Sequence, residues 1–205
     1  RFVQDVRTAV FTEGDFRMLA DANKNVYLFD GHASEEDAWV KRYLELGRQQ
    51  GYDKRYLTAS RTPWYSIENR PAAPIWVSVF NRRGLRFVRN EANVRNLTTF
   101  HCVYTKGVVD TDILFAYLLT SVAQQIFLDN SRQYGNGLVK FEPNDLNKGM
   151  VGDLTLLNKD EKVFVKSIYD LIRQQGDRTI ELVGQLDAFF LKKNMSTTND
   201  YNFNG

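Results

Sequence analysis

Arginine is the residue type in this 205-residue sequence whose number and spacing point most directly to a chemistry. Residues 61–104, which we call the arginine stretch, hold seven arginines and two glutamates, a net charge of +5, whereas the whole chain has +2. The seven are Arg61, Arg70, Arg82, Arg83, Arg86, Arg89 and Arg95. A planar guanidinium donates two parallel hydrogen bonds, so it fits phosphate oxygens and guanine edges. We interpret Arg82, Arg83, Arg86 and Arg89 as phosphate contacts, and Arg61 as a contact to a phosphate or a base edge.

Amides and aromatic rings lie among these arginines. Asn90 follows Arg89, and an asparagine amide can bond an adenine edge by donating and accepting at once. Trp64, Tyr65, Trp76, Phe80 and Phe87 are interspersed with the charges. Charge, amide and ring in one stretch indicate a surface that binds nucleic acid, with Asn90 and Tyr65 among its contacts.

A plainer interpretation stays open for both groups. A row of arginines can be a solvated edge that keeps one sheet from pairing with another. Aromatic rings in β-rich domains are most often core, and for Trp64 we favour this interpretation, with the ring under its loop.

His101 and Cys102 suggest a nucleophile or a metal ligand, but their spacing argues against catalysis. Neighbours in a strand point to opposite faces, so the two side chains cannot face one another. We therefore interpret His101 as a polar strand residue that contacts DNA. His32 is predicted to lie in a turn, with no second ligand at metal-binding spacing, so the sequence predicts no metal site.

Four short motifs, in this order, resemble one family. They are residues 61–65 (Arg-Thr-Pro-Trp-Tyr), 86–90 (Arg-Phe-Val-Arg-Asn), 100–104 (Phe-His-Cys-Val-Tyr) and 132–138 (Arg-Gln-Tyr-Gly-Asn-Gly-Leu). Together they resemble the C-terminal target-recognition region of TaqI-like adenine-specific DNA methyltransferases, a family that includes large fused restriction–modification enzymes. The resemblance covers about residues 10–155.

The resemblance implies that this chain reads a short sequence of double-stranded DNA for a catalytic domain of the same polypeptide. It places a loop with Tyr134 and Gly135 beside the DNA, Tyr134 as a base-stacking ring and the glycine where backbone and phosphate approach closely. The family's catalytic domain carries an Asn-Pro-Pro-Tyr motif and a glycine-rich loop for S-adenosylmethionine. Neither is present here, and no two of the four prolines are adjacent. The resemblance thus implies S-adenosylmethionine in the parent protein, no cofactor in this chain, and no activity of the chain alone.

The predicted fold is α+β, a mixed or antiparallel sheet with packed helices and a C-terminal helical hairpin. Strands are predicted at residues 7–11, 25–29, 75–80, 85–89, 98–104, 138–141 and 150–154, with loops at 81–84 and 132–137. The 75–80 strand is apolar on both faces and is therefore expected at the centre of the sheet. Helices are predicted from an N-cap at Ser34 to Arg48, at 113–128, and at 159–175 and 177–193.

Composition and length indicate how the chain divides into domains. We expect a target-recognition domain over residues 1–157, the helical hairpin over 158–195, and a flexible tail over 196–205. The hydrophobic content of 43% is ordinary for a globular protein, and no run of 18 apolar residues predicts a membrane span. The single cysteine excludes an internal disulfide and fits a reducing compartment, so we expect a cytoplasmic location. A first residue of Arg1 suggests a piece of a longer protein.

Two other functions remain open from the sequence. The chain could be the recognition domain of a separate type I specificity subunit, in which the hairpin is a spacer. It could instead be a basic protein–protein interaction module whose arginines bind an acidic partner.

Overall fold

The computed structural model of this chain describes residues 9–32, 34–68, 70–81, 85–107, 109–134, 137–175, 179–193, 195, 197–198 and 201–204. The chain divides into two compact units. The first consists of Arg1–Leu19 and Ala72–Gly205, and the second of Ala20–Pro71. The predicted boundary at residue 157 stays a prediction.

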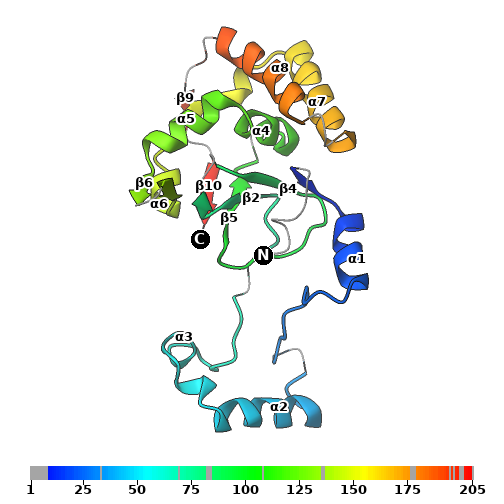
Figure 1. Cartoon of the computed structure of the whole chain (residues 1–205), viewed down its shortest axis with the longest axis vertical. Helices are drawn as coiled ribbons and strands as arrows, with labels where there is room; N and C mark the ends of the chain where they lie inside the picture. The colour runs from blue at the N-terminus through cyan, green and yellow to red at the C-terminus, as the bar shows by residue number, and fades with distance from the viewer. Residues whose placement is uncertain are drawn as a thin grey trace. The chain divides into compact units, whose positions relative to one another are not determined.

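A five-stranded mixed sheet forms the base of the first unit (Figure 1). Its strands, in spatial order, are β1 (Val10–Phe11), β4 (Phe87–Asn90), β2 (Ile75–Ser78), β5 (Phe100–Thr105) and β10 (Tyr201–Asn204). β1 runs parallel to β4, and the other pairs are antiparallel. With the helices described below, this sheet confirms the predicted α+β class.

β2 holds the central position that its sequence predicts. Ile75, Trp76 and Val77 are all buried, because β2 pairs with β4 on one side and β5 on the other. The predicted strand nevertheless ends at Ser78. Its last residue, Phe80, belongs to β3 (Phe80–Asn81), which joins β7 (Leu138–Lys140) and β6 (Arg132–Tyr134) in a second sheet of order β3-β7-β6.

The helix predicted at residues 113–128 is two helices. α4 (Thr111–Leu118) and α5 (Ser121–Asp129) are bent by 73° at the break between them. The hydroxyl of Thr120 accepts a hydrogen bond from the backbone of Ala123, 3.3 Å away, and so caps a new helix start. Within the described residues no single helix is long and apolar enough to cross a membrane, and only this bent pair passes that test by length and composition.

The predicted C-terminal hairpin is present as α7 (Lys159–Gln174) and α8 (Thr179–Lys192). Asn158 and Glu161 form a reciprocal capping box at the start of α7. Figure 1 shows α4 between the hairpin and the sheet, and the rings of Tyr117 and Phe190 lie 4.9 Å apart across the α4–α8 contact. The hairpin therefore shares one hydrophobic core with α4 and the sheet.

Short elements complete the first unit. They are α1 (Glu13–Asp21), α6 (Pro143–Leu146), β8 (Val151–Gly152), the 3-10 helix η4 (Leu154–Leu156) and β9 (Thr197–Thr198). The sequence analysis missed α1, although Thr12 and Asp15 bond each other's backbone N–H as a helix start does. Where the sequence predicts a tail, β9 pairs with β8 and β10 covers the edge of β5, whose backbone groups would otherwise lack ladder partners.

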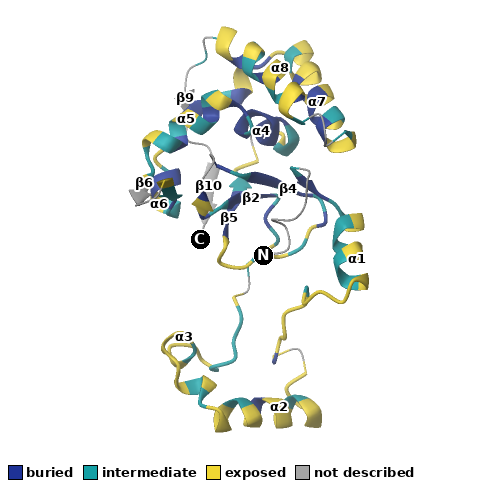
Figure 2. Ribbon diagram, in the orientation of Figure 1, coloured by how far each residue is buried: buried dark blue, intermediate teal, exposed yellow. Residues whose placement is uncertain are grey.

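The second unit is small and mostly exposed (Figure 2). It contains α2 (Ala38–Gln49), the 3-10 helix η2 (Tyr52–Lys54) and α3 (Tyr56–Ala59). The N-cap of α2 is Asp37, not the predicted Ser34, because the Asp37 carboxylate accepts from the backbone N–H groups of Trp39 and Val40. The strand predicted at residues 25–29 is wrong, since this segment has no ladder partner in the described chain.

Candidate nucleic-acid interface

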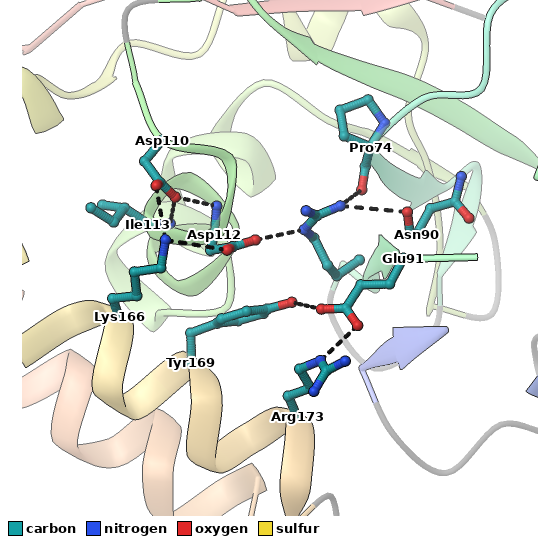
Figure 3. A network of polar contacts seen from close by, with 10 residues as sticks. Pro74, Asn90, Glu91, Asp110, Asp112, Ile113, Lys166, Tyr169 and Arg173 are labelled. Carbon is teal, nitrogen blue, oxygen red and sulfur yellow. Dashed lines mark hydrogen bonds and ion pairs between the residues drawn. The ribbon is translucent and has the colours of Figure 1, made fainter. Parts of the chain in front are cut away.

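Arg89, on β4, lies in a polar network within the first unit (Figure 3). Its Nε donates to the carboxylate of Asp112 at 3.0 Å, and its Nη1 donates to the carbonyl of Pro74 at 2.9 Å. The side chain is only 16% exposed. Arg89 therefore links β4 to the start of α4 and to the residue before β2.

Glu91 follows β4 and joins the same network to α7. Its carboxylate accepts hydrogen bonds from the hydroxyl of Tyr169 and from Nε of Arg173, the second at 2.6 Å. Burial by itself raises the pKa of Glu91, but the hydrogen bonds from Tyr169 and Arg173 outweigh it and hold the pKa below its ordinary value. The ionised form of Glu91 is thus the form that the structure stabilises.

A polar cavity of about 480 Å³ lies over this network. Its lining residues are Arg89, Asn90, Glu91, Asp112, Tyr169, Asp170 and Arg173. Three carboxylates face two guanidinium groups there, and both guanidinium groups already bond carboxylates. Such a lining does not attract a phosphate, so the network acts as a structural link between the sheet and the helices.

Asn90 and His101 are buried, at 4% and 6% exposure. The Asn90 amide donates to the carbonyls of Ala73 and Val94, both at 2.8 Å, and His101 Nε2 donates to the carbonyl of Phe141 at 2.8 Å. These bonds satisfy buried polar groups and fix neighbouring segments. Both side chains are therefore largely withdrawn from solvent and bonded within the domain.

The structure describes the remaining candidates of the first unit only in part. Arg82 and Arg83 are outside the described residues, as is Gly135. Arg86 is half-buried, and its backbone N–H donates to the amide oxygen of Asn81 at 3.3 Å. Tyr134 ends β6, where the structure describes its backbone alone.

Arg61 and Tyr65 belong to the second unit, in a loop of residues 61–66. Arg61 is exposed, and its Nη1 donates to the carbonyl of Ser66 at 2.8 Å. The hydroxyl of Tyr65 donates to the carboxylate of Glu35 at 3.0 Å. Desolvation, and then the hydrogen bond to the Glu35 carboxylate, raise the pKa of Tyr65, so its hydroxyl keeps the proton that it donates.

Trp64 packs against α2, as the core interpretation of this ring predicts. A Cβ built on Gly47 would lie 2.7 Å from the Trp64 ring, so only glycine fits at this contact. The Trp64 and Tyr65 rings meet edge to face with their centroids 5.7 Å apart. The loop therefore rests on α2 and presents Arg61 to solvent.

Sequence reasoning missed several residues that organise these sites. They are Glu35, Glu91, Asp112, Tyr169 and Arg173. Their partners lie 23 to 82 positions away in sequence, and no local pattern encodes such pairs. Among the described residues, no three His, Cys, Asp or Glu side chains gather in a way that could hold a metal ion.

Comparison with known proteins finds similarity to type II methyltransferases. Residues 2–191 match the family model described as type II methyltransferase M.Eco57I, C-terminal domain. The chain is 52% identical over 200 residues to type II methyltransferase M.AccI of Acinetobacter calcoaceticus, a match that covers 93% of this chain and 36% of M.AccI. It is 27% identical over 129 residues to type II methyltransferase M.XamI of Xanthomonas campestris pv. amaranthicola, which covers 63% of this chain and 24% of that protein. No solved structure matches the chain.

Proposed function

The chain belongs to the M.Eco57I C-terminal domain family of type II methyltransferases, and from this premise we propose that it reads the DNA sequence for such an enzyme. Specifically, we propose that it is the target-recognition part of an adenine-specific, S-adenosylmethionine-dependent DNA methyltransferase of a restriction–modification system. The observation that carries the proposal is the match of residues 2–191 to a C-terminal domain model. The concentration of arginine in residues 61–104 supports it.

The catalytic chemistry is proposed to lie outside this chain. The chain spans about a third of M.AccI and a quarter of M.XamI, so most of each relative's length lies beyond the match. S-adenosylmethionine would supply the methyl group in that remaining part. The polar cavity over Arg89 does not fit this cofactor, because its charged groups already pair with one another.

The proposed mechanism divides the work between the two parts. Phosphate contacts set the register of the protein on the duplex, and base-edge contacts specify the sequence. The target adenine is rotated out of the stack into the catalytic part, while this domain holds the flanking duplex. The side chains and backbone that we propose for these contacts are Arg61, Tyr65, Arg82, Arg83, Arg86, Tyr134 and Gly135.

Arg89, Asn90 and His101 receive a different role in this proposal. Their polar atoms bond Asp112, Ala73 and Phe141 within the domain. Moving them to DNA would leave buried groups unpaired, at a cost of about 1–3 kcal/mol each. We propose that they hold the strands that present the contact residues. A cytoplasmic location is part of the same proposal, since the substrate would be cellular DNA.

Binding of the chain to a fluorescently labelled duplex of random sequence tests the DNA part of the proposal. We expect binding whose affinity falls steeply as salt rises from 50 to 200 mM, because each neutralised phosphate releases counterions. Polyglutamate serves as the control competitor. If polyglutamate displaces the duplex as well as unlabelled DNA of equal charge does, the arginines bind acidic polymers in general and the proposal is wrong.

A further inference from the structure

Two segments of the second unit, 34 positions apart, are joined by a set of hydrogen bonds around His32. His32 Nδ1 lies 2.7 Å from Oε1 of Glu35, and His32 Nε2 lies 3.1 Å from the hydroxyl oxygen of Ser66. The same Oε1 accepts the hydroxyl of Tyr65 at 3.0 Å. The 30–35 turn and the 61–66 loop are thereby fixed to each other at two points.

The Glu35 carboxylate determines which group donates and which accepts in each of these hydrogen bonds. A carboxylate can only accept, so His32 Nδ1 carries the hydrogen that it donates to Glu35. In the neutral ring Nε2 is then the acceptor, and Ser66 donates its hydroxyl hydrogen to it. Ser66 in turn accepts the Nη1–H of Arg61 at its carbonyl, 2.8 Å away. The bonded series thus runs from Glu35 through His32 and Ser66 to Arg61.

Close packing supports the same arrangement. A Cβ built on Gly31 would lie 2.7 Å from the Tyr65 ring, so the turn backbone lies directly against that ring. The rings of His32 and Tyr65 have centroids 5.3 Å apart. The loop consequently packs against two elements: Tyr65 lies against the turn at Gly31, and Trp64 lies against α2 at Gly47.

A serine, a histidine and a carboxylate in this order also occur as the activated nucleophile of hydrolases. Here the side chains of His32 and Glu35 are each 45% exposed, so water screens their charge and competes for their bonds. The serine carbonyl is engaged by Arg61, and Glu35 is shared with Tyr65. These features are typical of hydrogen bonds that hold a loop in place, and not of an active site that excludes water.

We propose that His32 and Glu35 are positioning residues that set the direction of the Arg61 guanidinium toward a base edge of duplex DNA. They would thus determine sequence preference through Arg61. The inference rests on the proposed function of the chain as a DNA reader. The bond to Ser66 uses one of the five N–H donors of Arg61, which leaves the guanidinium able to make a bidentate contact in a fixed direction.

Selection from a randomised duplex pool, followed by sequencing of the bound fraction, measures the sequence preference. Arg61→Ala is expected to lower the preference at one or two base positions by about 5- to 150-fold. Glu35→Ala is expected to lower it at the same positions, by at least about threefold. Glu36→Ala is the matched control, because it removes the same charge at the next residue. The Glu36 carboxylate bonds Lys41 and not His32 or Tyr65.

The double variant Glu35→Ala/Arg61→Ala separates positioning from an independent contact. If Glu35 acts through Arg61, the double variant has the preference of Arg61→Ala alone. His32→Gln, which keeps a side-chain donor, is expected to retain more preference than His32→Ala. Ser66→Ala removes the hydroxyl that bonds His32 Nε2 and serves as the second probe if Glu35→Ala fails to fold by circular dichroism.

The outcomes distinguish this inference from the proposed function. If the unmodified chain does not bind duplex DNA, the proposed function fails and the inference falls with it. If the chain binds with a preference but Arg61→Ala leaves that preference intact, Arg61 is not a reader and the inference is overturned alone. It is equally overturned if Glu35→Ala and Ser66→Ala both behave like Glu36→Ala.

Discussion

The phenolic hydroxyl of Tyr169 donates a hydrogen bond to the carboxylate of Glu91, 78 positions earlier in the chain. Arg173, one turn further along α7, donates to the other oxygen of the same carboxylate at 2.6 Å. The residue that follows β4 is thus bonded to the C-terminal hairpin at both carboxylate oxygens. Together with the shared core, these bonds make the hairpin part of the body that contains β4 and residues 72–104 of the arginine stretch.

Tyr169→Phe is expected to lower the free energy of unfolding by about 1.5–3 kcal/mol, since the lost hydrogen bond has a charged acceptor. Urea unfolding followed by circular dichroism measures it. Tyr56→Phe is the matched control, because Tyr56 is 91% exposed, and it should change stability by less than about 0.5 kcal/mol. Equal losses in the two variants would show that the Tyr169–Glu91 bond contributes nothing of its own.

Glu91 gives the chain a predicted pH dependence. Its pKa in the folded protein lies below the ordinary value of 4.5, so its interactions stabilise the fold above that value and are lost as pH falls through it and below. Burial, and then the bond to Glu91, raise the pKa of Tyr169, so the hydroxyl stays protonated throughout this range. Unfolding free energies between pH 3 and 7 are the measurement. Glu91→Gln should flatten the acid side of the curve, and a parallel curve at lower stability contradicts the assignment.

Local signals in the sequence predict a good part of the fold. The apolar run at β2 predicts a central strand, and the helical patterns of residues 113–128 and 159–175 predict helices that begin within two residues of the starts of α4 and α7. These predictions succeed because burial on both faces and helical periodicity are properties of residues close together in the chain. The break at Thr120 was missed, although a threonine can cap a helix, because the apolar pattern continues across it.

The candidate site was less predictable for a physical reason. The roles of Arg89, Asn90 and His101 depend on Asp112, Ala73 and Phe141, which are 17 to 40 positions away in sequence. A polar residue type does not reveal whether its partner is DNA or a distant segment of the same chain. By contrast, the size of the Trp64 ring predicts that it packs under its loop, although the ring does not identify α2 as the partner.

The two helices of the hairpin offer a matched pair of isoleucines for testing its packing. Ile172 on α7 is fully buried, and Ile180 on α8 is 90% exposed. Ile172→Ala is expected to cost about 2–5 kcal/mol, because it removes buried methyl groups and leaves a cavity. Ile180→Ala should cost less than about 0.5 kcal/mol. Thermal and urea unfolding of both variants check this, and similar costs would mean that the hairpin does not share the core.

The chain alone is expected to transfer no methyl group. It contains no Asn-Pro-Pro-Tyr motif to hold a flipped adenine, and its polar cavity is lined by groups that pair with one another. Incubation with tritiated S-adenosylmethionine and mixed-sequence duplex DNA measures transfer, with a full-length type II methyltransferase in parallel. Incorporation above the level without protein would place catalytic groups in this chain and overturn the proposed division of work.

Arg86 and Arg89 lie three positions apart, and the structure predicts that their substitution by alanine changes different properties: DNA binding for Arg86 and stability for Arg89. Arg86→Ala, like Arg82→Ala and Arg83→Ala, should reduce the slope of log affinity against log salt by about one unit, through loss of a phosphate contact. Arg89→Ala should leave the slope unchanged and lower the free energy of unfolding by about 1–3 kcal/mol, because it removes a guanidinium bonded to Asp112 and Pro74. Salt titrations on one random duplex, paired with urea unfolding, measure both quantities for each variant. A shallower slope for Arg89→Ala at unchanged stability would assign this arginine to DNA. Unchanged slopes for Arg82→Ala, Arg83→Ala and Arg86→Ala would show that these three arginines form a solvated edge.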